Sequence, residues 1–226
     1  MNELEKTKSI NVYAKEVIGK TLLSAIPIAG TLVTVLWDAV KEYNLTNRQK
    51  EWEDTIELRL RKIEKTVEEV ASNDFFVTTL MATSLIAIKT SEKAKRDYLA
   101  NAVINSIEDN INESKLIIFL NLVDKYTVWH INFLQFFKNP LGTDIARQEF
   151  NRIGTMSSPS HLLQSVYPEF KDINREFMDK IVNDLISEGL LSSFSIHATM
   201  TSQGIVAKRT TQLGDDFLDF ITEHQD

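Results

Sequence analysis

The stretch TNRQKEWEDTIELRLRKIEKTVEEVASN, residues 46–73, decides the fold class of this chain. Its apolar residues recur at steps of three or four: Trp52, Ile56, Leu60, Ile63, Val67 and Val70. This period places them in one stripe along a helix, with charged side chains on the solvent side. The sequence therefore predicts one long amphipathic helix whose stripe packs against a partner. The candidate contact residues, either for a second chain or for the core of this one, are Trp52, Ile56, Ile63 and Val67.

Further helices are expected after this stretch. Residues 75–90, FFVTTLMATSLIAIKT, are apolar nearly all round, which predicts a buried helix. Residues 91–109 and 113–138 also show helical spacing, and Asn139-Pro140 ends the second of them. We therefore predict that residues 1–140 form an all-helical bundle.

Residues 141–226 follow a different pattern, and Leu141-Gly142-Thr143 marks the boundary. Gly189 fits a C-terminal helix cap. The pattern predicts three helices and two strands: helices at 161–167, 173–188 and 215–224, and strands at 190–200 and 205–213. This order, with the stretches DLISEGLL and TTQLGDDFLDFI, resembles the recognition helix, wing and exit helix of the winged-helix family. The predicted fold is mainly α, a helical bundle followed by a small winged-helix-like α+β module.

Winged helices most often bind DNA, so the 173–188 helix is a candidate for the major groove. However, residues 141–226 hold seven Lys and Arg against thirteen Asp and Glu, a net charge of −6. Such a module repels phosphates unless its cations gather on one face. The candidate nucleic-acid contacts are Arg175, Lys180, Lys208 and Arg209. Because acidic residues interrupt this set, we favour a protein partner over nucleic acid.

An uncharged segment, TLLSAIPIAGTLVTVLW, occupies residues 21–37. A membrane-spanning helix needs roughly 20 apolar residues, with a lower limit near 17. Four hydroxyl side chains dilute this run, and Pro27 with Gly30 interrupts it. We favour a hairpin in the core of the bundle, and the alternative is insertion of residues 17–40 into a membrane. Because cysteine is absent and the first residues do not read as a secretory signal, we expect a cytoplasmic protein, with membrane association as the alternative.

The sequence contains none of the common phosphate-binding, zinc-protease or serine-hydrolase motifs. Its four histidines are scattered, so we expect no metal site and no cofactor. One polar group stands out on the apolar helices, and we interpret it as a buried network that fixes helix register rather than as a catalytic site. Its members are Asn101, Asn105, Asp124, Thr127 and His130.

Residues 26–140 combine several distinctive pieces: Ile26-Pro27 with Gly30, Arg48 with Trp52, Asn73 with Phe76, and the stretches ATSLIAIKT, YLANAVINS and IFLNLVDKYTVWHINFLQFFKNP. Together they resemble an uncharacterised family of bacterial helical proteins. The resemblance implies a helical front followed by a small C-terminal module, and it implies no catalytic residues.

These observations favour a non-enzymatic regulatory or adaptor protein that acts through protein–protein contacts and self-association. The first alternative is a membrane-acting effector, of the kind used in bacterial defence, that inserts residues 17–40. The second alternative is a winged-helix regulator that binds DNA.

Overall fold

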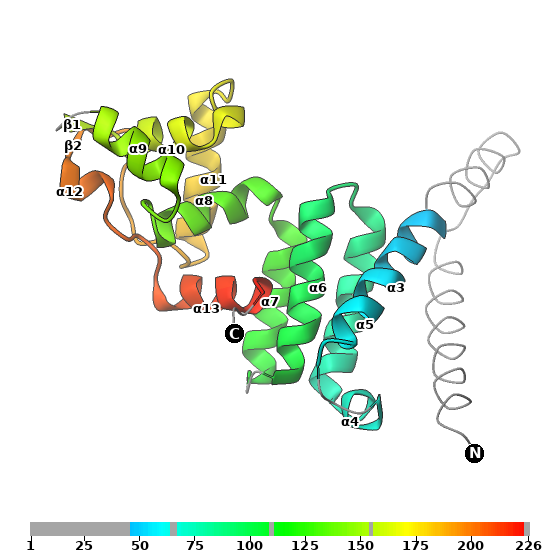
Figure 1. Cartoon of the computed structure of the whole chain (residues 1–226). Helices are drawn as coiled ribbons and strands as arrows, with labels where there is room; N and C mark the ends of the chain where they lie inside the picture. Colours follow the sequence, from blue (N-terminus) through cyan, green and yellow to red (C-terminus); the bar gives the residue numbers. More distant parts are fainter. Residues whose placement is uncertain (1–45, 64–66, 109–110, 154–155, 224–226) are drawn as a thin grey trace, which may run out of the picture. The chain divides into compact units, whose positions relative to one another are not determined.

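The computed structural model describes residues 46–63, 67–108, 111–153 and 156–223. Within these residues the chain is mainly helical, as predicted, and its one sheet has two short strands (Figure 1). The uncharged segment 21–37, and with it the choice between a core hairpin and membrane insertion, lies outside the described residues. The chain divides into two compact units between Asp124 and Lys125.

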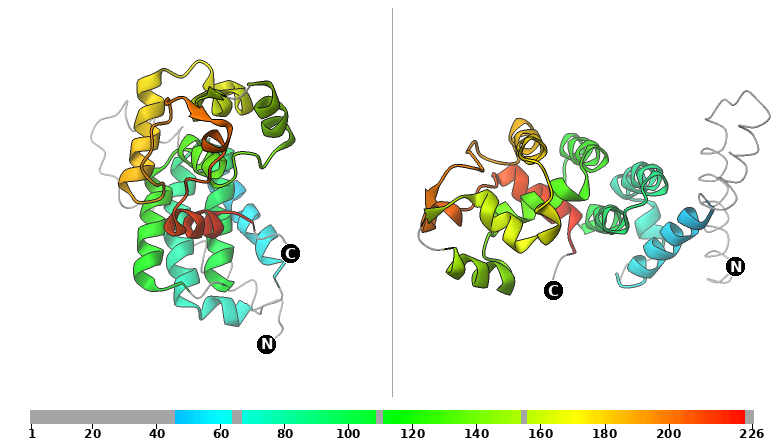
Figure 2. Two further views of the ribbon diagram at one scale, coloured as in Figure 1. Left: turned by 90° about the vertical axis from the view of Figure 1, so that its left-hand side faces the viewer. Right: turned by 90° about the horizontal axis from the view of Figure 1, so that it is seen from above.

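In the first unit the structure describes α3 (Thr46–Leu60), α4 (Val67–Ala71), α5 (Asp74–Lys89), α6 (Lys93–Glu108) and α7 (Glu113–Lys125). The core is built on the contact between α5 and α6, and α3 packs against both of them. Helix α7 lies beside α6 (Figures 1 and 2). At the end of α7 the Lys95 ammonium of α6 donates to the Asp124 carbonyl at 2.9 Å.

The stretch 46–73 is not the single helix that its stripe predicts, because α3 ends at Leu60 and α4 begins at Val67. Two of the candidate contact residues, Trp52 and Ile56, are buried in the first unit. The Trp52 indole N–H donates to Ser84 Oγ at 2.9 Å, so α5 of the same unit covers this part of the stripe. Ile63 is partly exposed, and the side chain of Val67 lies outside the described residues.

Helix α5 is capped by Asn73, whose side chain accepts the Phe76 N–H at 3.1 Å. The expectation that residues 75–90 are buried all round is wrong for one face. Val77, Met81 and Leu85 are exposed, because α3, α4 and α6, the described helices with the main contacts to α5, cover its other sides. Helix α5 therefore has an apolar face that the described helices leave in contact with solvent.

In the second unit the structure describes α8 (Val128–Lys138), α9 (Asp144–Arg152), β1 (Met156–Ser157), α10 (Pro159–Val166), the short 3-10 helix η2 (Pro168–Phe170), α11 (Arg175–Ser187), β2 (Met200–Thr201), α12 (Ser202–Ile205) and α13 (Gln212–Ile221). Helix α8 contributes five buried apolar residues to the core, more than any other described helix of this unit: Ile131, Phe133, Leu134, Phe136 and Phe137. Helices α11 and α13 both pack against α8. Gly189 ends α11 with a φ of 72°, as expected of a C-terminal cap.

The two compact units divide the chain before α8, whereas the sequence pattern placed the boundary at residues 140–141. The expected helix over 113–138 consists of α7 and α8, which are separated at Tyr126 and Thr127. Thr127 has an extended backbone, with φ −82° and ψ 165°. Its N–H donates to His130 Nδ1 at 3.3 Å, which gives this N–H a partner that is not a helical carbonyl. This bond allows a new helix to start at Val128.

The expected hairpin of strands 190–200 and 205–213 is wrong in its regular form. The described residues contain only a two-residue pairing of β1 with β2, in which Met156 pairs with Thr201, and an isolated bridge between Leu191 and Thr210. Two backbone bonds join the expected strands around this bridge, from the Ser192 N–H to the Arg209 carbonyl and from the Thr211 N–H to the Leu190 carbonyl, and other backbone groups of the region bond to helices. The Ile196 carbonyl accepts the Ser160 N–H at 3.0 Å, and the Arg209 N–H donates to the Phe137 carbonyl at 2.9 Å. These bonds satisfy groups that a ladder would otherwise pair.

Candidate functional site

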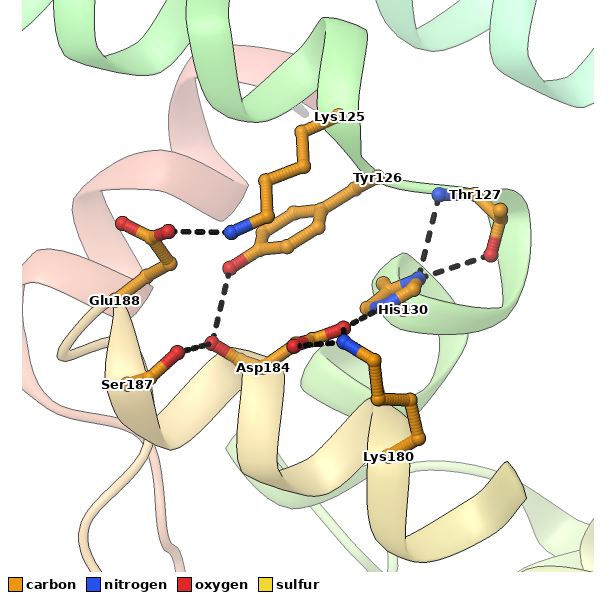
Figure 3. A network of polar contacts seen from close by, with 8 residues as sticks. All are labelled: Lys125, Tyr126, Thr127, His130, Lys180, Asp184, Ser187 and Glu188. Carbon is orange, nitrogen blue, oxygen red and sulfur yellow. Dashed lines mark hydrogen bonds and ion pairs between the residues drawn. The ribbon is translucent and has the colours of Figure 1, made fainter. Parts of the chain in front are cut away.

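A polar network joins the start of α8 to the second half of α11 inside the second unit (Figure 3). The His130 ring is buried between them. Its Nδ1 lies 2.9 Å from Thr127 Oγ1 and accepts the Thr127 backbone N–H, so Nδ1 carries no proton. The other ring nitrogen, Nε2, lies 3.4 Å from Asp184 Oδ2 and donates to it. His130 is therefore the neutral tautomer with its proton on Nε2.

Asp184 is the centre of the network. Lys180, one helical turn earlier, donates to both carboxylate oxygens at 2.5 and 2.6 Å. The backbone carbonyl of Asp184 accepts the Ser187 hydroxyl at 2.9 Å and lies 3.5 Å from the Tyr126 hydroxyl. An ion pair of Lys125 with Glu188 closes the end of the network (Figure 3).

Aromatic packing also holds Tyr126 and His130 in place. The Tyr126 ring is fully buried and stacks on the His130 ring with 4.8 Å between centroids. Its edge also meets Phe217 of α13 at 6.1 Å. Tyr126, which lies between α7 and α8, is therefore a fixed point of the second unit.

Burial and neighbouring charges set the protonation states of His130, Asp184 and Tyr126 near neutral pH. Burial lowers the pKa of His130, and this outweighs the hydrogen bond and charge of Asp184, which act to raise it. Burial alone would raise the pKa of Asp184, but the hydrogen bonds and charges of Lys180 and His130 hold it below its ordinary value of 3.8. Burial raises the pKa of Tyr126, and the charges of Glu188 and Asp184 raise it further. The ring of His130 is neutral, and the Asp184 carboxylate is ionised and paired.

This arrangement is poorly suited to acid–base catalysis. Both nitrogens of His130 and both carboxylate oxygens of Asp184 already have partners inside the unit. A general base must reach the proton of a substrate directly or through one water. The network acts instead as a clamp that fixes α8 on α11.

Of the five residues of the predicted network, three lie in the first unit and two in the second. Asn101 and Asn105 are buried in α6 of the first unit, and the carboxylate of Asp124 is exposed. Asn101 Oδ1 accepts from the Arg59 guanidinium. Thr127 and His130 contact each other, as their spacing of three predicts. The residues of α11 that complete the network were not among the predicted ones, although the Lys180–Asp184 spacing of four is a recognisable helical ion pair.

Each of the four candidate nucleic-acid cations has a partner within the second unit. Arg175 lies 3.8 Å from Asp179, and Lys180 pairs with Asp184. Lys208 pairs with Asp215. Burial alone would raise the pKa of Asp215, but the hydrogen bonds donated by Lys208 and Thr210 hold it below its ordinary value. Arg209 donates to the Gly204 carbonyl at 3.0 Å and stacks over the Phe194 ring at 5.2 Å.

A second polar cluster joins α10, α11 and the segment before β2. His197 Nδ1 lies 3.1 Å from Ser160 Oγ, and His197 Nε2 lies 3.1 Å from Asp179 Oδ1. The residue types are those of a hydrolase triad, but the ring is reversed, because Nδ1 rather than Nε2 faces the serine, and Nε2 makes no hydrogen bond to Asp179. The nearby N–H groups are also occupied. The N–H of Ser160 donates to the Ile196 carbonyl, and that of His161 donates to Ser158. The first turn of α10 therefore leaves few donors to stabilise an oxyanion.

The part of the chain that the structure describes contains no group of three or more residues able to hold a metal ion. Among the described helices, none combines the length and apolar character that crossing a membrane requires. Comparison of the chain with protein-family models, curated proteins and solved structures gives no match. The resemblance of residues 26–140 to a bacterial helical family stays a prediction.

Proposed function

We propose that the protein is a non-enzymatic adaptor whose second unit is a winged-helix-like module that binds another protein. The order of helices and extended segments in the second unit supports a winged-helix-like module. Helices α10 and α11 are followed by two extended segments that meet at Leu191 and Thr210, and α13 ends the unit. β1, immediately before α10, pairs with β2 in the region that follows α11.

The observation that carries the proposal is an exposed aromatic residue on α11. Phe177 is 46% exposed, and its ring meets Trp129 of α8 at 5.6 Å. Trp129 in turn contacts the buried Phe170 at 4.9 Å, so the pair is held on a rigid base. Aromatic side chains on rigid elements are typical centres of protein–protein interfaces. We call Trp129 and Phe177 the aromatic pair.

The charges beside the aromatic pair indicate the chemistry of the partner. Exposed carboxylates lie on η2, in the turn after it and on α11, at Glu169, Asp172 and Glu176, and they outnumber the exposed Lys171 of the same turn. The cations of α11, Arg175 and Lys180, are committed to carboxylates of the same helix. The partner segment that fits this surface is basic and carries an apolar anchor for the aromatic pair. A duplex fits it less well, since counterion release needs cations that are available to phosphates.

A peptide library displayed on phage tests the proposal with the immobilised full-length chain. We expect selected peptides to combine Lys or Arg with a large apolar residue. Phe177→Asp should weaken their binding by about 30-fold, the effect of losing a central interface residue. The matched control is Ile145→Asp, since Ile145 is 56% exposed on α9 of the same unit and should not alter binding. Peptides that bind Phe177→Asp as well as wild type would overturn the proposal.

A DNA titration tests the alternative that the second unit binds DNA rather than a protein. With a mixed-sequence duplex at about 50 mM salt, where phosphate contacts are strong, we expect no saturable binding. Saturable binding that is abolished by Lys208→Glu and Arg209→Glu would instead support a DNA-binding regulator.

A further inference from the structure

Helix α5 presents an apolar stripe that the described helices leave exposed. Val77, Met81 and Leu85 are 39%, 56% and 44% exposed. They are four residues apart, so they lie on one face of the helix over a length of about 12 Å. The exposed face of a surface helix is normally polar. We call these three residues the α5 stripe.

The contacts of α3 locate the point at which the preceding chain reaches this unit. The Arg48 guanidinium donates to the Ile88 carbonyl at 3.4 Å, and Trp52 bonds to Ser84. The start of α3 therefore lies at the end of α5 that carries Leu85. The chain that precedes Thr46 must arrive at this end of the α5 stripe.

The sequence immediately upstream can reach the whole stripe. Eight residues, DAVKEYNL at 38–45, separate the uncharged segment 21–37 from α3. An extended connection of this length spans about 26 Å, which exceeds the length of the stripe about twofold. Within the segment, Leu32 and Leu36 are four residues apart, the spacing of the α5 stripe.

We propose that segment 21–37 of the same chain packs on the α5 stripe. The segment contains no charge, so burying it against the stripe desolvates no ionic group. A segment tethered by a short connection has an effective concentration in the millimolar range, which favours it over a second copy of the chain at ordinary protein concentrations. The interaction would cover the exposed α5 stripe with an uncharged stretch of the same chain.

Engineered cysteine pairs test this packing in the full-length chain, because the natural sequence contains no cysteine. With Leu36→Cys and Met81→Cys, mild oxidation should give a monomeric species that runs faster on a non-reducing gel. The control pairs Leu36→Cys with Ile118→Cys, since Ile118 is 49% exposed on α7 of the same unit. We expect at least about tenfold faster cross-linking at Met81, which reflects proximity rather than random encounter.

Two results would overturn the proposal. Equal rates for the Met81 and Ile118 pairs would mean that the segment does not select the α5 stripe. Disulfide-linked dimers from the Met81 pair, in place of the fast monomer, would mean that a second copy covers the stripe.

A single-cysteine experiment avoids any effect of the disulfide on folding. An environment-sensitive fluorophore on Met81→Cys should report an apolar surrounding in the full-length chain. Adding Leu32→Glu and Leu36→Glu should shift its emission toward that of the fluorophore in water. An emission that these two changes leave unaltered would contradict the proposal, and so would an apolar signal that appears only after anionic phospholipid vesicles are added.

Discussion

Gly214→Ala is expected to destabilise the second unit, although alanine is the better helix former. Gly214 lies in the first turn of α13, and a Cβ atom there would stand 2.2 Å from the Leu190 carbonyl oxygen. Real Cβ atoms stay beyond 3.0 Å of such atoms, so α13 or the Leu190 peptide must move by about 0.8 Å. The same carbonyl accepts the Thr211 N–H at 3.0 Å, and the Thr211 hydroxyl donates to Gly189 at 2.6 Å. The displacement therefore strains the junction between α11 and α13.

The size of the effect follows from three contributions. Overpacking against backbone costs about 1–3 kcal/mol, and the movement weakens a hydrogen bond worth about 1 kcal/mol. Replacing glycine by alanine in a helix returns about 1 kcal/mol. With the clash at the upper end because both groups are backbone, we expect a net loss of about 2–3 kcal/mol. At a urea slope of about 2 kcal/mol per molar, the unfolding midpoint falls by about 1–1.5 M.

Urea unfolding followed by tryptophan fluorescence and circular dichroism measures this shift. The matched control is Gly189→Ala, where no atom lies within 4 Å of the added Cβ and only the φ of +72° opposes the change. That backbone conformation costs an alanine about 1–2 kcal/mol. Gly214→Ala should therefore be the more destabilising of the two. A Gly214→Ala protein as stable as wild type would refute the close approach of α13 to Leu190.

Two further predictions concern the network and the first unit. The free energy of unfolding of the wild type should decrease as pH falls through 6.5, the ordinary pKa of histidine. Below this pH the unfolded chain binds a proton at residue 130, whereas the lowered pKa of buried His130 keeps the folded chain unprotonated there. The lowered pKa of Asp184 adds a similar loss below pH 3.8. In urea titrations at several pH values His130→Gln should reduce this slope, by at most about 1.4 kcal/mol per pH unit, and identical slopes would contradict the assignment. In the first unit, Trp52→Phe and Ser84→Ala should each weaken folding, and their double-mutant cycle should give a coupling of about 1 kcal/mol for the indole hydrogen bond. A coupling near zero would mean that this bond does not form in solution.

The helical character of the chain could be predicted because local signals suffice for it. Asn73 caps α5 and Gly189 ends α11, and both positions were readable from residue type alone. The break at Tyr126 and Thr127 could not be predicted in this way, since neither residue is a helix breaker and the apolar period continues through them. It depends on the burial of Tyr126 and on the bond from Thr127 to His130, which exist only in the folded unit.

The extended region after α11 also differs from its prediction, because strands were expected there and a regular ladder does not form. Residues 190–213 contain alternating apolar and polar positions, which predict strands. A strand ladder requires two segments whose backbone groups have no stronger partners. Here the Ile196 carbonyl and the Arg209 N–H bond instead to the helices, to the Ser160 N–H and the Phe137 carbonyl. Sequence period alone cannot decide between these partners, because both satisfy the backbone.

The candidate network was half predictable for a similar reason. Thr127 and His130 are three residues apart, whereas His130 and Asp184 are 54 residues apart and meet only through the packing of α8 on α11. The ion pairs along α11, by contrast, follow from spacing of four and bear directly on the choice of partner. A count of charges gives the sign of the field, but pairing decides which cations can meet phosphate. A surface with paired cations and an exposed Phe177 gains affinity from two sources, the desolvation of apolar area and the attraction of its exposed carboxylates for a basic partner. Added salt should weaken only the second, so we expect the loss of binding caused by Phe177→Asp to persist at high salt.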